Sequence, residues 1–302
     1  MALKKLTNKV ALVTGANKGM GYQTALALAS RDWKVIMADK DDQTESRRKI
    51  IEETCNENVV VGHLDLASFK SVRSFAKEIT DKEEHLDVLI NNAGIFCMKN
   101  RRTYDGLDGV IQVNHLGPFL LTNLLLDSLK KSGKGRIIFV TSNGAFFHNL
   151  TLGSLLQPKL FFPNILSTTL NYYNSKLCNM IASKGFAERL RNSKVTCNCL
   201  HPGMTNTSFL VKDSKEDGYL EKIMKQVTKN ALKYTTNDAK NSAGLAVFLA
   251  TSKSVQGVTE EYFVNYQIHR QPQVLDDAKF CNKIWNESEK LVGISGKESD
   301  IV

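Results

Sequence analysis

Short apolar runs alternate along the chain with longer segments whose apolar residues recur at helical spacing. The runs are rich in β-branched residues and almost continuously apolar, which favours strands covered on both faces of a parallel sheet. The longer segments fit the helices of βαβ units. We predict strands at Val10–Thr14, Lys34–Ala38, Asn58–Asp65, Leu86–Asn91, Arg136–Thr141, Val195–Leu200 and Tyr262–Asn265, and helices at Gly21–Arg31, Ser68–Ile79, Tyr104–Lys131, Tyr172–Arg191 and Asp238–Ala250.

The alternation predicts an α/β protein, a single-domain Rossmann fold with a doubly wound, parallel seven-stranded sheet over residues 1–302. No linker rich in proline or serine divides the chain. Two segments, 146–169 and 207–236, are too long for ordinary connections. Apolar residues in 207–236 recur at intervals compatible with one helical face, so this segment is either a substrate lid or a helix packed permanently on the core.

The composition is that of an ordinary globular protein, with 42% hydrophobic and 24% charged residues. No uncharged apolar run approaches the roughly 18 residues needed to span a bilayer, and the start of the chain lacks the apolar region of a secretory signal. We therefore expect no membrane span and a cytoplasmic location. The six cysteines are scattered, which indicates reduced thiols and no metal site.

The formal net charge is +9. Such a charge could attract nucleic acid, but the basic residues are interleaved with acidic ones and no recognition motif accompanies them. We expect a solvated basic surface and no nucleic-acid partner.

A cluster of glycines, Thr14-Gly15-Ala16-Asn17-Lys18-Gly19-Met20-Gly21, connects the first predicted strand to the first helix. Glycines let the backbone turn sharply and approach a pyrophosphate, and the helix that follows offers free N–H groups to the anion. Glycine also serves plain turns, but the strand–turn–helix context favours a dinucleotide site. The residues expected to contact the dinucleotide here are Gly15, Asn17, Lys18, Gly19, Met20 and Gly21.

Tyr172 and Lys176 lie four residues apart in a predicted helix, so their side chains share a face. A tyrosine with a pKa near 10 is a poor base at neutral pH, and a nearby ammonium lowers that pKa towards the working range. A surface pair is the alternative, and it loses weight because Ser142, which follows a predicted strand, can donate to a substrate oxygen. Tyr173 is only three residues from Lys176 and breaks the spacing.

Further motifs follow in a fixed order, each at the end of a strand or within a helix. Asp65 and Ser142 end predicted strands, Asn91-Asn92-Ala93-Gly94 closes another, Asn114 lies within a helix, and His201-Pro202-Gly203 follows the sixth strand. Together with the glycine cluster and the Tyr-x-x-x-Lys pair, this series resembles the short-chain dehydrogenase/reductase superfamily.

The resemblance implies a catalytic set. Hydride moves between a nicotinamide and the substrate carbon, Tyr172 gives or takes the hydroxyl proton, and Ser142 orients the oxygen. Lys176 also binds the nicotinamide ribose, and Asn114 holds a water that links Lys176 to solvent. The cofactor contacts that the resemblance adds are Asp65 at the adenine, Leu66, Asn92, Ala93, Gly94, Tyr172, Lys176, Pro202, Gly203, Thr205 and Thr207.

Within the superfamily the chain is most similar to the retinol dehydrogenase-like branch, through the segments 62–68, 112–122 and 172–177 and a tryptophan-bearing C-terminal helical extension at 275–293. The branch implies a small lipophilic substrate, an alcohol or carbonyl of the retinol, steroid or isoprenoid kind. The segment between Ser142 and Tyr172 is rich in apolar groups, which suits either a hydrophobic substrate wall or simple packing.

The sequence leaves three properties open, namely the oligomeric state, the catalytic activity and the cofactor. The family often forms a homodimer through the helices bearing Asn114 and Tyr172, but the C-terminal extension could block or alter it. A catalytically idle dinucleotide-binding regulatory or scaffold protein of the same fold is the alternative to an enzyme, although it would be expected to lack the tyrosine, serine or lysine.

The third open property is the cofactor. Asp39 follows the second strand, where a carboxylate accepts the ribose hydroxyls and favours NAD. Lys40 and Lys18 are two cations near the position of a 2′-phosphate. Two cations against one carboxylate favour NADP over NAD.

Overall fold

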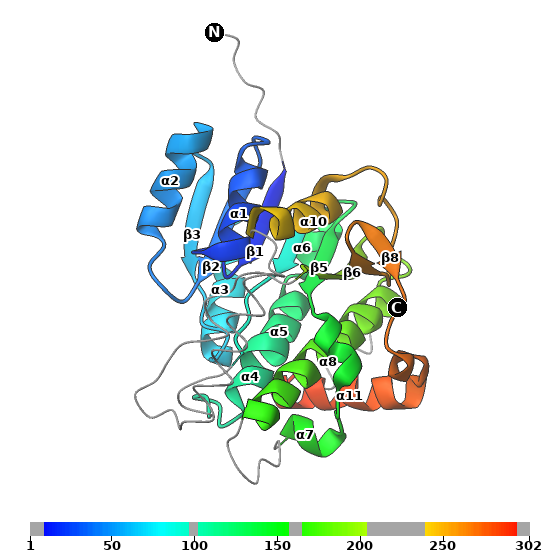
Figure 1. Cartoon of the computed structure of the whole chain (residues 1–302). Helices are drawn as coiled ribbons and strands as arrows, with labels where there is room; N and C mark the ends of the chain where they lie inside the picture. Colours follow the sequence, from blue (N-terminus) through cyan, green and yellow to red (C-terminus); the bar gives the residue numbers. More distant parts are fainter. Residues whose placement is uncertain (1–8, 97–101, 157–164, 204–238, 295–302) are drawn as a thin grey trace.

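Eight strands form one sheet in the order β3-β2-β1-β4-β5-β6-β7-β8 (Figure 1). The structure is a computed structural model and describes residues 9–96, 102–156, 165–203 and 239–294. The first seven strands run parallel to their neighbours, which is the predicted doubly wound sheet. Their bounds are β1 Val10–Thr14, β2 Lys34–Asp39, β3 Val59–His63, β4 Val88–Asn91, β5 Arg136–Val140, β6 Thr196–His201 and β7 Tyr262–Val264.

The eighth strand, β8 (Gln267–His269), is antiparallel to β7 and was not predicted. Asn265 and Tyr266 form the turn between them, with φ of 49° and 66°. Two consecutive residues with positive φ are typical of the tight turns that join hairpin strands. The three residues of β8 are all exposed, so no apolar alternation announces this strand.

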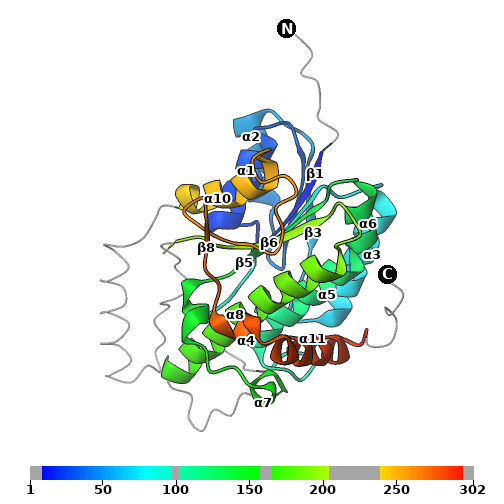
Figure 2. The same ribbon diagram turned by 90° about the vertical axis from the view of Figure 1, so that its right-hand side faces the viewer.

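Helices cover both faces of the sheet (Figure 2). One core contains residues of α1 (Gly19–Ala29), α2 (Thr44–Thr54) and α10 (Ala239–Thr251). The other contains residues of α3 (Phe69–Lys82), α5 (Gly117–Leu124) and α8 (Ile165–Arg189). The interior strands are therefore enclosed on both sides, as their continuous apolar character predicts.

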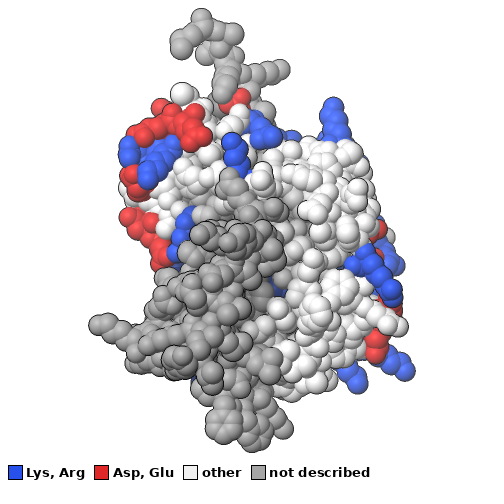
Figure 3. All heavy atoms as spheres, viewed as in Figure 1, with Lys and Arg blue, Asp and Glu red and all other residues white. Residues whose placement is uncertain are grey.

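The apolar pattern of the sequence does not predict helix α2. Only Ile50 and Thr54 are buried in it, and most of the other positions are charged or polar. Such a helix has no apolar stripe of helical period to detect. Basic and acidic side chains lie side by side over α2, and Figure 3 shows no broad patch of a single sign among the described residues on this face.

The helix predicted over 104–131 is divided into pieces. Asp108 caps α4 (Gly109–Ile111) by accepting hydrogen bonds from the backbone N–H groups of Val110 and Ile111. A π-helical turn, Gln112–Leu116, follows and leads into α5, after which α6 (Leu126–Lys131) completes the segment. A π-turn inserted in an α-helix is frequent at functional sites. This one contains Asn114.

The C-terminal helix α11 (Ala278–Val292) lies on the outer side of α5 and α8, away from the sheet (Figure 2). It follows a short 3₁₀ turn, Gln273–Asp276, and Asp277 caps it. Two further short helices are a 3₁₀ turn at Asn143–Phe147 and α7 (Leu152–Leu156), which contacts α11. The predicted lid at 207–236 lies outside the described residues. No helix in the described part of the chain has both the length and the apolar character needed to cross a membrane.

Candidate active site

The candidate site begins where β1 and β4 end side by side, at the point where the strand order reverses. In open α/β sheets ligands bind at this switch point. Gly15 directly follows β1 and has a φ of +66°, a conformation that favours glycine. A Cβ on Gly21 would overlap with the carbonyl oxygen of Gly15, so these two positions require glycine for close packing. The backbone around them and the start of α1 form a cradle that fits a pyrophosphate.

The loops after β1 and β4 are joined by hydrogen bonds. The hydroxyl of Thr14 accepts from the backbone N–H of Asn92 and of Ala93, both at 3.0 Å. The Asn92 side chain donates to the carbonyl of Thr14 at 2.7 Å. The expected cofactor residues of the two loops therefore form one rigid edge of the site.

Asp39, at the end of β2, uses both carboxylate oxygens to hold the backbone. It accepts from the N–H of Asn17 at 3.3 Å and from the N–H of Asp41 at 3.2 Å. Lys18 and Lys40 are exposed. Asp65, after β3, accepts from the N–H of Ala67 at 2.9 Å, which closes the turn that carries Leu66.

Tyr172 and Lys176 project from α8 towards the end of β5. The hydroxyl of Ser142, the residue after β5, is close enough to the phenol of Tyr172 to lower its pKa. The ammonium of Lys176 lies 5.5 Å from the centre of the Tyr172 ring and donates to the carbonyl of Val140 at 2.9 Å. The ring of Phe96 lies 5.4 Å from that of Tyr172. The structure thus brings the predicted tyrosine, serine and lysine together.

Burial sets the pKa values of this pair. It raises the pKa of the Tyr172 phenol well above its ordinary range, with a smaller rise from Tyr173 and a lowering by the Ser142 hydrogen bond. It lowers the pKa of Lys176 to about 8. Lys176 is not among the groups that lower the pKa of the Tyr172 phenol, so the expected effect of the lysine is not found in the protein by itself, where desolvation of the phenolate sets the direction. The Lys176 ammonium hydrogen-bonds Val140 instead.

Asn114 is fully buried in the π-turn, and hydrogen bonds fix its side chain. Its carboxamide oxygen accepts from the N–H of Ile95 at 2.7 Å, and its nitrogen donates to the carbonyl of Ile95 and to the hydroxyl of Ser175. Gly94 lies between this amide and Lys176, since a Cβ there would be 3.4 Å from the amide oxygen and 3.2 Å from the Lys176 ammonium. All four expected catalytic residues are therefore neighbours.

Two groups of supporting residues were not foreseen. Ser175 lies inside the Tyr172–Lys176 motif, and its place beside the lysine was the only sequence signal for it. Asn143, next to Ser142, accepts a hydrogen bond from the phenol of Tyr262 at 2.5 Å, and its N–H donates to His201 at 3.4 Å. No local pattern indicates that partnership, since β7 and the end of β6 supply the two partners.

Tyr173, the rival proton-transfer residue, lies elsewhere in the site. Its ring covers Gly144 so closely that a Cβ there would overlap with it, and Phe147 lies 6.3 Å away. Pro202 and Gly203 follow β6 and are partly exposed, and Gly203 has a φ of +79°. Thr205 and Thr207 lie outside the described residues.

A dinucleotide cradle at the switch point, beside a tyrosine, a serine and a lysine, is typical of Rossmann-fold oxidoreductases that act on CH–OH groups. Comparison with known proteins makes the class specific. Residues 9–153 match the family model described as short chain dehydrogenase. Human retinol dehydrogenase 13 is 36% identical over 293 residues, covering 96% of this chain and 86% of that protein. Bovine dehydrogenase/reductase SDR family member 13 is 32% identical over 299 residues, covering 98% and 76%.

The chain belongs to the short-chain dehydrogenase/reductase family and to its retinol dehydrogenase-like branch. It is an NAD(P)-dependent oxidoreductase that acts on CH–OH groups.

Solved structures show the same fold. An uncharacterized protein from Mycobacterium paratuberculosis superposes with a TM-score of 0.72 at 28% identity, covering 97% of this chain and 96% of its own. A short chain dehydrogenase from Escherichia coli, complexed with NADPH, superposes with a TM-score of 0.63 at 22% identity, covering 85% and 96%.

Proposed function

We propose that this protein interconverts a lipophilic alcohol and its carbonyl compound, with Tyr172 as the proton donor and acceptor. The observation that carries the proposal is that Ser142 and Lys176 lie beside the phenol of Tyr172, at the ends of β4 and β5. A nicotinamide cofactor bound in the glycine cradle would supply or accept the hydride. The chain's own residues would bind the substrate oxygen and move its proton.

The protonation state of Tyr172 suits carbonyl reduction. A phenol whose pKa is raised by burial keeps its proton at neutral pH and is ready to donate it to a developing alkoxide. Ser142 supplies a second hydroxyl at the same oxygen. Lys176, with a pKa near 8, is charged in most molecules at neutral pH and favours the phenolate left after the transfer. Asn114 would fix the backbone beside Lys176. We also propose that Asn114 holds a water molecule that links Lys176 to solvent.

The substrate we propose is lipophilic, a retinol-like, steroid or isoprenoid alcohol or carbonyl. Phe146 and Phe147 follow Ser142 on the 3₁₀ turn and are 43% and 71% exposed, so two large apolar surfaces lie a few residues after Ser142. Phe96 adds a third ring next to Tyr172. Several relatives are named retinol dehydrogenases, which agrees with an apolar substrate.

We propose NADP(H) as the preferred cofactor. The carboxylate of Asp39 already accepts two backbone N–H groups, which offset part of its charge and leave it less able to repel a 2′-phosphate. Lys18 and Lys40 are exposed on either side of it in sequence and can pair with that phosphate.

The test is turnover of NADPH and NADH with a panel of hydrophobic aldehydes and ketones, comparing wild type with Tyr172→Phe. Loss of the general acid should lower kcat/KM by about 10²- to 10⁴-fold while nucleotide binding persists. Tyr173→Phe is the matched control, since it removes a phenol one residue away and should change kcat/KM by less than about threefold. Equal turnover by wild type and Tyr172→Phe would refute the assignment. Nucleotide binding by a wild type that turns over no substrate would instead favour the regulatory or scaffold alternative.

A further inference from the structure

The π-turn that carries Asn114 is held between two helices. On one side, Asn179 of α8 donates to the main-chain carbonyl of Asn114 at 2.9 Å, and Ser175 bonds the Asn114 side chain. On the other side, His115 points away from the site towards α11. Its imidazole Nε2 lies 2.8 Å from the hydroxyl of Ser288.

The Ser288 hydroxyl lies 2.8 Å from the carbonyl of Ile284 as well as 2.8 Å from Nε2 of His115. It has a single proton for these two acceptors, and it accepts from His115 in the tautomer that carries the hydrogen on Nε2. Burial lowers the pKa of His115 to about 4, so the ring is neutral at physiological pH and has only one N–H to give. His115 and Ser288 are 1% and 0% exposed, which leaves water no access to either group.

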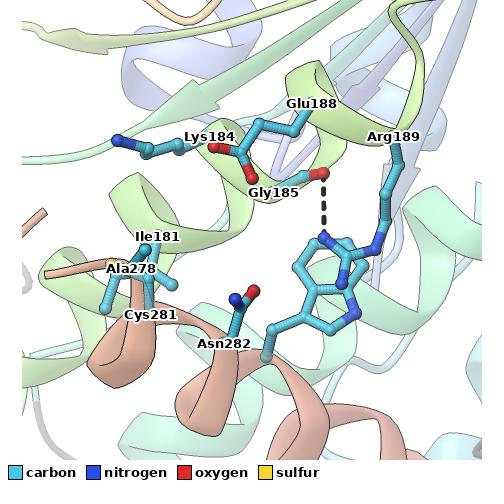
Figure 4. A pocket seen from close by; sticks show the side chains of 9 residues that line it. Ile181, Lys184, Gly185, Glu188, Arg189, Ala278, Cys281 and Asn282 are labelled. Atoms are coloured by element: carbon cyan, nitrogen blue, oxygen red, sulfur yellow. Dashed lines mark hydrogen bonds between the residues drawn. The ribbon is translucent and has the colours of Figure 1, made fainter. Parts of the chain in front are cut away.

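Trp285 lies one turn before Ser288 and packs against α5 and α8. Its indole makes edge contacts with Phe119 and Phe186, at centroid distances of 4.7 and 4.9 Å. The guanidinium of Arg189 lies 3.8 Å from the ring centre, and Gly185 leaves room for the ring (Figure 4). Phe119 lies one helical turn after His115, with the two rings 5.8 Å apart. Helix α11 thus contacts the π-turn and α8 together.

We propose that α11 is a positioning element for the candidate site, in which Ser288 bonds His115, Trp285 packs on the neighbouring Phe119, and the two together fix the π-turn that presents Asn114. Its catalytic consequence rests on the proposed function, whereas its structural consequence does not. A π-turn is rare and occurs mostly as a single turn within an α-helix, frequently at a functional site. Here the partner on the outer side comes from a segment 173 residues further along the chain.

The simpler view is that α11 only adds stability. The two views predict different effects of a substitution in α11 on the local structure around Asn114. The N–H of Ile95 donates to the Asn114 side chain at 2.7 Å, so native-state hydrogen exchange of that single amide reports whether Asn114 is in place. A purely stabilising helix would not affect this amide beyond the change in global unfolding.

The experiment compares Ser288→Ala with Val292→Ala, a variant that weakens the same helix without touching His115. Exchange at Ile95 is measured by amide hydrogen exchange, and kcat and KM are measured with NADPH and a hydrophobic aldehyde. For Ser288→Ala we expect Ile95 to exchange up to about tenfold faster than in Val292→Ala, as loss of one buried hydrogen bond implies. We also expect a lower kcat with an unchanged KM for the nucleotide. Ser288→Thr keeps the hydroxyl and should restore both.

The proposal fails if Ile95 exchange and kcat in Ser288→Ala equal those of Val292→Ala, or if Ser288→Thr restores neither. A wild type inactive with every substrate would refute the proposed function alone, because Ile95 exchange would still decide the role of α11. Should Ser288→Ala not fold, Ser288→Cys, which keeps a weaker acceptor, gives an intermediate exchange rate if the proposal holds and the wild-type rate if it does not.

Discussion

Burial acts in opposite directions on the two titratable side chains of α8, because it disfavours whichever form carries charge. The phenol of Tyr172 is kept protonated and the ammonium of Lys176 is weakened, so both groups move towards their neutral forms. Lys176 donates to the carbonyl of Val140, and the Ser142 hydroxyl lowers the pKa of the phenol against the larger effect of burial.

The lowered pKa of Lys176 predicts a pH-dependent stability. In the unfolded chain the lysine keeps its proton up to a pKa of 10.5, whereas in the folded protein it loses the proton near pH 8. Between these values the unfolded state binds more protons, so the contribution of Lys176 to stability rises with pH. We expect the free energy of unfolding of wild type relative to Lys176→Met to increase by about 2 kcal/mol between about pH 7 and about pH 9.5. Urea denaturation of both proteins at the two pH values measures it, and a pH-independent difference would contradict it.

Asp39 gives a second prediction at this scale. Replacing it by alanine removes the carboxylate nearest the expected 2′-phosphate while Lys18 and Lys40 remain. We expect Asp39→Ala to raise the ratio of kcat/KM for NADPH to that for NADH by about tenfold, an effect of one partly solvated charge. Steady-state kinetics with both cofactors measure the ratio. A preference for NADH that survives the substitution would contradict the role given to Asp39.

At the scale of elements, the close packing of α11 on α8 requires a small residue at position 185. A Cβ at Gly185 would overlap with the indole of Trp285, which is packed against Phe119 and Phe186. Alanine normally favours a helix over glycine by up to about 1 kcal/mol, but overpacking here should exceed that gain.

We therefore expect Gly185→Ala to destabilise the protein by about 1–3 kcal/mol in a denaturation experiment. Gly153→Ala in α7 is the matched control, because nothing lies closer to its Cβ position than the Thr151 hydroxyl at 3.8 Å. That substitution should be neutral or slightly stabilising. Equal changes in the free energy of unfolding for the two substitutions would show that the indole of Trp285 can move to make room for the added methyl group.

At the scale of the whole molecule, α11 covers the outer surface of α5 and α8 (Figure 2). These are the helices adjoining Asn114 and bearing Tyr172, on which a family-type homodimer would be built. Trp285 and Ile284 are buried against them, and Arg73 of α3 donates to the carbonyl of Val292 at 2.6 Å. A homodimer on this surface would have to displace α11.

This arrangement predicts how self-association responds to substitution. Trp285→Ser removes the indole from between Phe119 and Phe186, so we expect the variant to be destabilised and its mass in light scattering to rise with concentration. Lys283→Ser, on the exposed side of the same helix, should leave the mass of the wild type unchanged. A wild-type dimer that Lys283→Ser dissociates would place the interface on α11 itself and contradict the prediction.

Much of this molecule can be read from local sequence. The interior parallel strands follow from apolar runs, because a strand enclosed on both faces must be apolar along its length. The glycine cluster and the Tyr172–Lys176 spacing follow from backbone and helix geometry that adjacent residues specify. Elements without such a local signal cannot be predicted from the sequence, as with the charged helix α2 and the exposed strand β8.

Tertiary structure decided the rest. The sequence placed Tyr172 and Lys176 on one helical face, but only the packed structure shows how far each is removed from water, Lys176 almost fully and Tyr172 partly. This desolvation raises the pKa of Tyr172, against the expected direction. Tertiary structure also decided that Asn114 lies in a π-turn held from both sides, with His115 bonded to Ser288 across 173 residues. The physical reason is common to these cases. Periodicity and motif spacing record interactions between residues close in the chain, whereas desolvation and long-range hydrogen bonds depend on which distant segments exclude water together.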